Sequence, residues 1–238
     1  MDSRTQELSN VSGDRSALLL GAKHALAEPA IILFFALMSF GVTATDAGFS
    51  NTEALLSTAF LWALPAQIAH AESIAIGAGV FASATAVLLT NLRFFPMIIS
   101  LLPRLNVGRS ILNNIGVSHL VTATSWAWCM ERIGSLPTHC RTAYFYGFSI
   151  TCWVLGVFGA ATGLFLTGLL PPLLKMLSLY IAPLYMLLLL TGVRGHRLVA
   201  LLAGGSIGLI LFKYGTDWYL PIAALTGGAC GFLVRNRT

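Results

Sequence analysis

Long stretches without a charged side chain are the feature that most constrains how this chain can fold. Eight runs of at least 15 residues carry no Asp, Glu, Lys or Arg, and they cover residues 29–45, 54–71, 73–92, 110–130, 142–174, 176–193, 198–212 and 218–234. A helix needs about 20 apolar residues to cross a bilayer, with a range of about 17–25. Charged residues make up 10% of the chain, against about 25% in soluble proteins. The sequence therefore predicts an all-α integral membrane protein.

The lengths of these runs indicate that the helices are not all simple crossings. Several runs are short for a straight passage, and the run 142–174 is too long for one. We expect a polytopic helical bundle with broken or re-entrant helices and about six to eight membrane segments. Residues 1–20 are expected to form a polar cytoplasmic tail, and residues 21–238 a single transmembrane domain.

Basic residues set the expected orientation, because Lys and Arg concentrate in cytoplasmic loops. Arg4 and Arg15 lie near the N-terminus, the loop 46–53 has two acids and no base, and the loop 104–109 begins and ends with Arg. We therefore expect both termini and the loop 104–109 to be cytoplasmic. The run 110–130 lies between two basic loops and cannot be one complete crossing. It is predicted to be a re-entrant or interfacial segment, or a pair of half-helices.

Three helix breakers interrupt the second and third uncharged runs. Pro65 removes a backbone donor, and Gly77 and Gly79 weaken the helix that follows. We expect helix breaks at these three positions. Broken helices near the midplane are a common way for transporters to build binding sites, since half-helix ends offer partial charges to a ligand.

Two titratable residues lie between these breaks and are candidates for proton or ion coupling. His70 could act as a proton relay, or it could satisfy a backbone carbonyl opened by the break. Glu72 could carry a proton within the membrane, or it could lie at the external interface. Both alternatives are open from the sequence.

The polar triplet Asn91-Leu92-Arg93 interrupts sequence that is otherwise compatible with lipid. An arginine in hydrocarbon costs about 2.5–3.5 kcal/mol on insertion scales. Arg93 is therefore either part of a substrate or gating site, or a side chain that extends from a helix end to lipid headgroups. In one straight helix Glu72 and Arg93 would lie about 31 Å apart, so they can meet only if the chain folds back near Gly77. The predicted substrate-binding residues are Gln67, Asn91 and Arg93.

Other classes of function find little support in the sequence. The four cysteines make no C-x-x-C pair, so neither a metal site nor a cofactor is expected. The net charge of +5 is spread over short loops, which does not indicate nucleic acid. No nucleophile–base motif appears at recognisable spacing, so an enzyme is not expected. Glycine motifs such as Gly156-x-x-Gly159-x-x-x-Gly163 allow close helix packing, either within the chain or against a partner.

These motifs together resemble the AzlC family, the large subunit of branched-chain amino acid exporters. The residues that carry the resemblance are Pro65-Ala66-Gln67, Asn91-Leu92-Arg93, the following Leu102-Pro103, and a second block of Tyr144, Gly147, Trp153, Gly156, Gly159 and Gly163. Their order and spacing match from Pro29 to Leu190. The chain departs from the family pattern at Phe94, where the family usually has histidine.

The resemblance implies a permease of the bacterial cytoplasmic (inner) membrane that exports branched-chain or related small apolar amino acids, driven by an ion gradient. It also implies a small hydrophobic AzlD-like membrane subunit as partner, with the lipid bilayer and the amino acid as the other contacts. The alternatives are an exporter or channel for another small amphipathic metabolite, a membrane-embedded enzyme, and a non-transporting assembly subunit.

Overall fold

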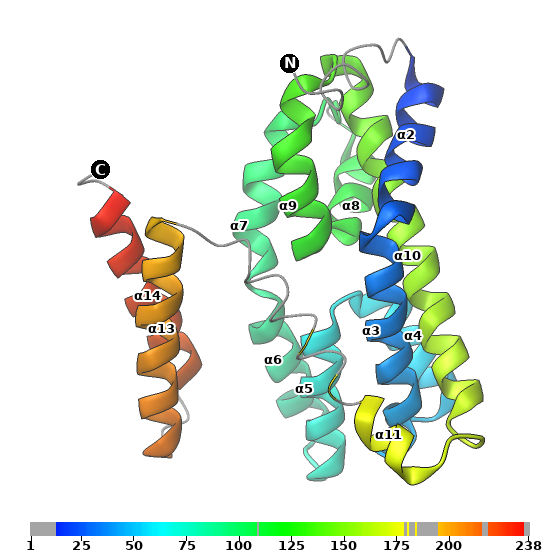
Figure 1. Cartoon of the computed structure of the whole chain (residues 1–238), viewed down its shortest axis with the longest axis vertical. Coiled ribbons are helices and arrows are strands. Elements are labelled where there is room, and N and C mark those ends of the chain that lie inside the picture. The colour runs from blue at the N-terminus through cyan, green and yellow to red at the C-terminus, as the bar shows by residue number, and fades with distance from the viewer. Residues whose placement is uncertain are drawn as a thin grey trace. The chain divides into compact units, whose positions relative to one another are not determined.

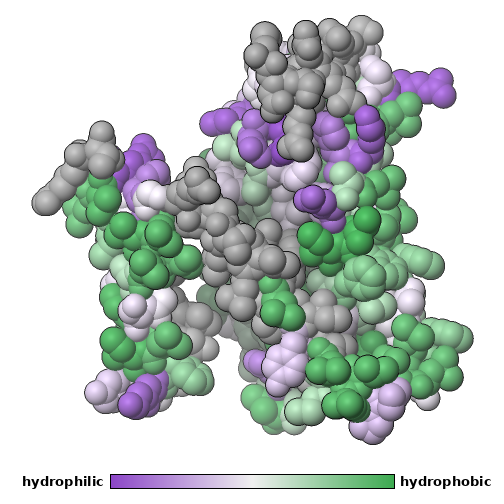
Figure 2. All heavy atoms as spheres, in the orientation of Figure 1, coloured by the Kyte–Doolittle hydropathy of each residue, from purple (hydrophilic) through white to green (hydrophobic). Residues whose placement is uncertain are grey.

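The computed structural model describes residues 13–108, 110–178, 180, 184, 195–215 and 219–235. The chain forms two compact units, Met1–Pro183 and Leu184–Thr238. All the regular elements in the described residues are helices (Figure 1). Large apolar side chains such as Phe81, Leu88 and Phe158 are exposed on these helices, and Figure 2 shows extensive hydrophobic surface with hydrophilic side chains gathered near the start of α2. The expected class of all-α membrane protein is confirmed.

Three long helices pack together on one side of the first unit (Figure 1). Helix α2 (Asp14–Ala27) begins within the segment expected to be a tail, and it meets α3 (Pro29–Ala44) at a bend of 56°. Pro29 occupies the start of α3, where its missing N–H has no helical partner to lose. Helix α10 (Arg141–Leu166) runs along both α2 and α3. With the preceding turn it is long and apolar enough to cross a membrane alone.

Glycines let α10 approach these neighbours closely. A Cβ atom at Gly147 would collide with the backbone of Leu18 in α2, and one at Gly159 would collide with the backbone of Phe34 in α3. The glycine motif of α10 therefore allows helices of the same chain to pack closely, which is one of the two alternatives given by the sequence.

Between α3 and α10 the chain forms a helix–turn–helix unit followed by a bent helix. Helices α4 (Asn51–Leu61) and α5 (Leu64–Ala75) are joined by two residues, and we call the pair hairpin 1. Pro65 lies in the first turn of α5, and Gly77 and Gly79 lie between α5 and α6 (Val80–Asn91). Gly77 has a φ of +67°, which glycine adopts without the steric cost of a Cβ. Helix α7 (Phe94–Leu101), with the 3₁₀ turn η1 (Leu102–Arg104), continues α6 after a bend of 44°.

The same pattern then recurs. Helices α8 (Ile111–Leu120) and α9 (Ala123–Arg132) are joined by Val121 and Thr122, and we call this pair hairpin 2. Of the alternatives given for the run 110–130, a pair of short helices is the one that the structure shows. The short turns η2 (Ile133–Ser135) and η3 (Thr138–Cys140) lead into the long helix α10. Hairpin 1 lies in the half of the first unit that contains α11, and hairpin 2 lies in the opposite half (Figure 1).

Helix α11 (Pro172–Ser178) is the last helix of the first unit among the described residues, and most of the uncharged run 176–193 lies outside them. The second unit contains α13 (His196–Lys213) and α14 (Tyr219–Arg235), which pack against each other through Gly204 and Gly227. By length and composition, the described residues contain one helix able to cross a membrane, or up to three if each bent pair is one span.

Candidate functional site

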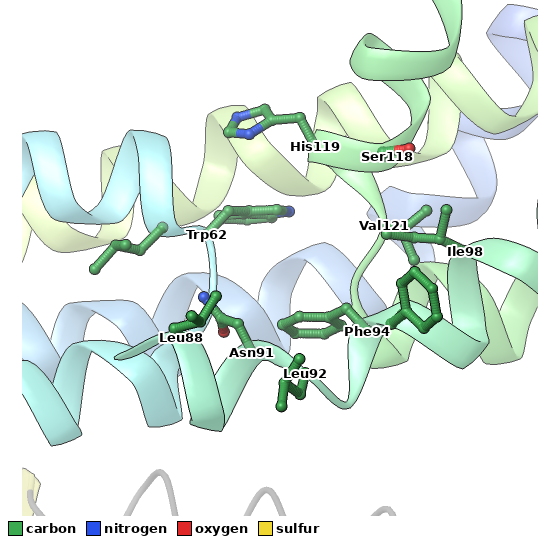
Figure 3. Close-up of a pocket in the computed structure, with 11 residues that line it drawn as sticks. Trp62, Leu88, Asn91, Leu92, Phe94, Ile98, Ser118, His119 and Val121 are labelled. Atoms are coloured by element: carbon green, nitrogen blue, oxygen red, sulfur yellow. The ribbon is translucent and has the colours of Figure 1, made fainter. Parts of the chain in front are cut away.

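The tips of the two hairpins meet at a cavity beside the bend between α6 and α7. This cavity has a volume of about 330 Å³ (Figure 3). Its lining residues are Leu61 and Trp62 from hairpin 1, Ser118, His119 and Val121 from hairpin 2, and Leu88, Asn91, Leu92, Phe94, Phe95 and Ile98 from the α6–α7 region. We call it the tip cavity. Most of the lining therefore comes from places where a helix starts, stops or bends.

Trp62 holds the most unusual backbone conformation at this site. It ends α4 with φ 45° and ψ 36°, and it is the one described non-glycine residue with a positive φ. A bulky residue in this region is a steric outlier, and such outliers cluster at functional sites. Its side chain is 5% exposed, and its indole Nε1 has no hydrogen-bond partner. The Trp62 N–H is therefore a buried donor at the cavity wall.

Asn91, the last residue of α6, supplies the matching acceptor. Its Oδ1 is buried without a hydrogen-bond partner, and its side chain lines the tip cavity. In the view of Figure 3 the Trp62 ring lies between His119 and the pair Asn91 and Phe94. An unpaired buried polar group costs about 1–3 kcal/mol. The unpaired Trp62 N–H and the unpaired Asn91 Oδ1 belong to residues that line the same cavity, so one small polar ligand could pair with both.

One backbone oxygen ties the two hairpins to α10. The carbonyl oxygen of Ala59 lies in the last turn of α4, where carbonyls lack partners within the helix. It accepts a hydrogen bond from His119 Nε2 in hairpin 2 at 3.1 Å and one from Trp153 Nε1 in α10 at 3.0 Å. The helix ends at the cavity are thus held by side chains from elements that are distant in sequence.

Gln67 lies one turn into α5 and stays outside the tip cavity. It is fully buried, and its Nε2 donates to Thr58 Oγ1 at 2.7 Å and to Ser57 Oγ at 3.2 Å. Both partners belong to α4, so Gln67 fastens the two arms of hairpin 1 together. Its Oε1 has no partner.

Arg93 lies at the bend between α6 and α7, near the middle of the bent pair Val80–Arg104. Its side chain is exposed, and its guanidinium carbon lies 4.9 Å from the centroid of the Phe94 ring. The chain does fold back near Gly77, but among the described residues no ion pair joins Arg93 to Glu72. Arg93 does not line the tip cavity, although its neighbours Leu92 and Phe94 do.

His70 and Glu72 face different sides of α5. His70 Nδ1 lies 2.7 Å from Ser83 Oγ in α6, and its ring lines a second cavity of about 560 Å³. This second cavity shares Leu61, Leu88 and Asn91 with the tip cavity. Glu72 is exposed and lines a third cavity of about 410 Å³ between α3 and α5, together with Asp46.

Comparison with known protein families identifies the group to which the chain belongs. The model of the AzlC protein family matches residues 29–170, which is more than half of the chain. This chain belongs to the AzlC family. It is 26% identical over 206 residues to the inner membrane protein YgaZ of Escherichia coli (strain K12), a match that covers 82% of this chain and 80% of that protein. No solved structure matches it significantly.

The AzlC match contains both hairpins, the α6–α7 bend and α10, so it contains the whole tip cavity. Membership in this family indicates a transport-related role in a membrane. Of the three predicted substrate-binding residues, the structure places Asn91 at the cavity, Gln67 behind it and Arg93 beside it. In the residues that the structure describes, no group of three or more His, Cys, Asp or Glu side chains could hold a metal ion.

Sequence reasoning missed Trp62 and His119 as cavity residues. Trp62 directly precedes the proline element, and nothing in the local pattern distinguishes it from an apolar packing residue. His119 carried a usable signal, because it is the one histidine in the uncharged run 110–130, and the run was already expected to be re-entrant.

Proposed function

We propose that this AzlC-family chain is the large subunit of an inner-membrane permease that exports branched-chain or related small apolar amino acids. The observation that carries the proposal is the tip cavity, with its unpaired Trp62 N–H and unpaired Asn91 oxygen among apolar walls. Its volume of about 330 Å³ lies at the lower end of the usual range for ligand pockets, about 300–1,000 Å³. The volume of the tip cavity is therefore suited to a small ligand.

Each part of a zwitterion with an apolar side chain has a counterpart at this cavity. The carboxylate would accept from the Trp62 N–H, and the nearby N-terminal ends of α5 and α9 favour negative charge. The ammonium group would donate to Asn91 Oδ1. The side chain would pack against apolar walls such as Leu88, Phe94 and Ile98.

The same chemistry rejects other amino acids. Lysine or glutamate would bring an additional charge into the cavity, where no lining residue carries a formal charge of opposite sign when His119 is neutral. A charge without a counter-ion in such surroundings is costly. Isoleucine, leucine and valine are therefore the expected substrates.

Gln67 and Arg93 support this function indirectly. Gln67 would hold the tip of hairpin 1 in place through Thr58 and Ser57. Arg93 would hold a carboxylate at the entrance to the cavity, either from the substrate or from a protein partner. A small AzlD-like hydrophobic subunit is proposed as that partner, because exposed apolar side chains such as Leu89 and Phe95 flank Arg93 on the same bent helix.

Flux measurements with purified protein in liposomes test the proposal. We expect exchange of labelled leucine against internal leucine, with the small AzlD-like subunit co-purified, and no exchange of lysine or glutamate. Trp62→Phe keeps an aromatic ring but removes the donor. A hydrogen bond to a charged group contributes about 1.5–3 kcal/mol, so we expect the KM for leucine to rise about tenfold or more.

Matched substitutions away from the cavity provide the controls. Trp126→Phe removes an indole N–H whose partner is Ser100 Oγ, and the KM should change little. Asn91→Ala should weaken exchange, whereas Asn113→Ala, near the start of α8 and away from the cavity lining, should not. Turnover of a compound without flux would favour the enzyme alternative, and the absence of both would favour an assembly subunit.

A further inference from the structure

Trp153 of α10 belongs to the block of residues that carries the family resemblance, but it does not line the tip cavity. Its indole Nε1 donates to the carbonyl oxygen of Ala59 at 3.0 Å. Its ring packs against two clusters of buried side chains, one that contains Trp62 of hairpin 1 and one that contains Val117 and Val121 of hairpin 2. Trp153 therefore connects α10 to the buried clusters of both hairpins.

The carbonyl that Trp153 binds lies three residues before the strained end of α4. Trp62 ends this helix in the left-handed region, with φ 45°. A helix that ends in a left-handed residue commonly satisfies its last carbonyls with the backbone N–H groups that follow. At Ala59 the two donors that the structure shows are instead side chains of other elements, Trp153 and His119. The end of α4 is therefore held from outside hairpin 1.

Of these two donors, Trp153 is the one that packs into the interior. His119 is exposed, so water competes for its bond to the Ala59 oxygen. The Trp153 ring is half-buried, and its contacts with the two clusters restrict the direction of its N–H. We therefore expect Trp153 to contribute more than His119 to the position of this carbonyl.

Gly156, one turn further along α10, gives the same turn a second restraint. A Cβ atom at Gly156 would come within 2.6 Å of the Trp62 ring. Residues three apart lie on the same face of a helix, so Trp153 binds the backbone of this turn while Gly156 leaves room for its ring. A bulky residue in the left-handed region persists only where the surrounding structure holds it there. The face of α10 formed by Trp153 and Gly156 provides such support for Trp62.

We propose that Trp153 is a positioning residue of the tip cavity, which keeps Trp62 in its left-handed conformation and thereby directs the Trp62 N–H toward the amino acid. The inference rests on the proposed function, in which that N–H binds the substrate carboxylate. Without the Trp153 N–H, the Ala59 oxygen would keep only its exposed partner, and the last turn of α4 could relax. The Trp62 donor would then lose its fixed direction, so the affinity for leucine would fall.

Trp153→Phe tests this role, because it removes the N–H and keeps an aromatic ring. The net contribution of one hydrogen bond corresponds to a change of about two- to tenfold in an equilibrium constant. We expect the KM for leucine exchange to rise by about this factor, with a smaller change in the rate at saturating leucine. Trp126→Phe, which removes an N–H that donates to Ser100 Oγ, is the matched control and should leave the KM unchanged.

A double variant shows whether Trp153 acts through Trp62. Once Trp62→Phe has removed the cavity donor, the direction of that donor no longer matters. Trp62→Phe combined with Trp153→Phe should therefore have the KM of Trp62→Phe alone. If Trp153 merely stabilised the protein, the two effects on KM would multiply. Multiplied effects, or a wild-type KM in Trp153→Phe, would overturn the inference while leaving the proposed function intact.

Deuterium uptake at the end of α4 tests the positioning without any transport measurement. Trp153→Phe should speed uptake at the amides of Phe60 and Leu61, which belong to the last turn, but not at Leu55, which lies nearer the start of the helix. Equal uptake at Phe60 and Leu61 in both proteins would contradict the inference. If wild-type protein shows no leucine exchange at all, the proposed function fails, and deuterium uptake alone decides whether Trp153 holds this turn.

A closer mimic of tryptophan covers the case in which Trp153→Phe does not fold. The amino acid 3-benzothienylalanine, incorporated at position 153 by stop-codon suppression, has nearly the shape of tryptophan but carries sulfur in place of the N–H. The substituted protein should show the same rise in KM and the same faster deuterium uptake at Phe60 and Leu61. Wild-type values of both quantities in this protein would overturn the role assigned to the Trp153 N–H.

Discussion

At the scale of single residues, the position of the Trp62 ring depends on a glycine in α10. The Trp62 ring lies so close to α10 that a Cβ atom at Gly156 would come within 2.6 Å of it. Gly156 therefore provides the space that the ring occupies. Trp62 is at the tip of hairpin 1 and its indole N–H is the buried donor of the cavity. The space left by Gly156 on α10 therefore helps to set the position of this donor.

We expect Gly156→Ala to displace the Trp62 ring or the backbone of α4, because the overlap cannot relax without movement. Overpacking of this kind costs about 1–3 kcal/mol. Thermal unfolding in detergent should show a lower Tm together with weaker leucine exchange. Gly205→Ala is the matched helical control, since nothing lies within 4 Å of a Cβ there, and its Tm should be unchanged or slightly higher.

Arg93 is the residue for which the alternatives from the sequence are still open. If it holds a carboxylate, Arg93→Lys should insert and fold normally but lose most transport, since a planar fork with paired donors binds a carboxylate better than a point charge does. Expression and leucine exchange of Arg93→Lys and Arg93→Gln should be measured together. Normal exchange by both variants would show that Arg93 is only an anchor to the headgroups.

At the scale of elements, hairpin 1 has a defined start. Ser50 caps α4 by accepting from the Glu53 N–H, and Glu53 accepts from the Ser50 N–H and hydroxyl at 2.8 and 2.7 Å. This reciprocal arrangement is a capping box. It sets where the first arm of hairpin 1 begins, just as Gln67 holds its second arm against the first.

The capping box predicts a dependence on pH at the start of α4. Hydrogen bonds, first from the Ser50 hydroxyl and then from its backbone N–H, lower the pKa of Glu53. A lowered pKa in the folded state means that the stabilisation is present at neutral pH and is lost as the pH falls below the ordinary glutamate value, about 4.3. Hydrogen exchange of the amides of Glu53 and Ala54, corrected for intrinsic rates, should therefore show less protection at about pH 3 than at pH 6. Glu53→Gln should show the same protection at both.

At the scale of the whole first unit, one pattern occurs twice in opposite orientations. Hairpin 1 leads into the bent pair α6–α7, and hairpin 2 leads into α10. The hairpins enter from opposite halves of the unit (Figure 1), and their tips meet at the cavity. Oppositely oriented repeats around a central site are a common basis of alternating access in transporters.

This arrangement predicts that the two hairpins begin on opposite sides of the membrane. Cysteines introduced at Asn51, the first residue of α4, and at Asn106, before α8, should be labelled from opposite sides by an impermeant maleimide in a cysteine-free background. The distribution of basic residues predicts that the Asn106 side is cytoplasmic. Equal labelling of both positions from outside would contradict both the topology and the opposed orientation.

The sequence by itself determined the class, the family and the location of the broken segments. These conclusions rest on local features, namely uncharged runs, proline, glycine and the distribution of basic residues. Each of them affects whether a segment forms a helix in lipid, or how that helix is oriented, without reference to the rest of the fold. These features predicted a helical membrane protein and the half-helices of hairpin 2. They also identified Asn91 as a candidate site residue, because an amide within an apolar run can be recognised from the sequence alone.

Only the tertiary structure decided which polar residues share a cavity. Gln67 and Asn91 are both amides within apolar runs, and each has a side-chain oxygen without a hydrogen-bond partner. Gln67 Nε2 donates to Thr58 and Ser57 within hairpin 1, whereas Asn91 lines the tip cavity. Trp62 and His119 are 57 positions apart in the chain, and they line one cavity because two hairpins meet tip to tip. The local sequence shows that a polar group lies in an apolar segment, where its burial costs free energy. The hydrogen-bond partner that offsets this free energy belongs to another element. Which element supplies it depends on the packing of segments that are far apart in sequence.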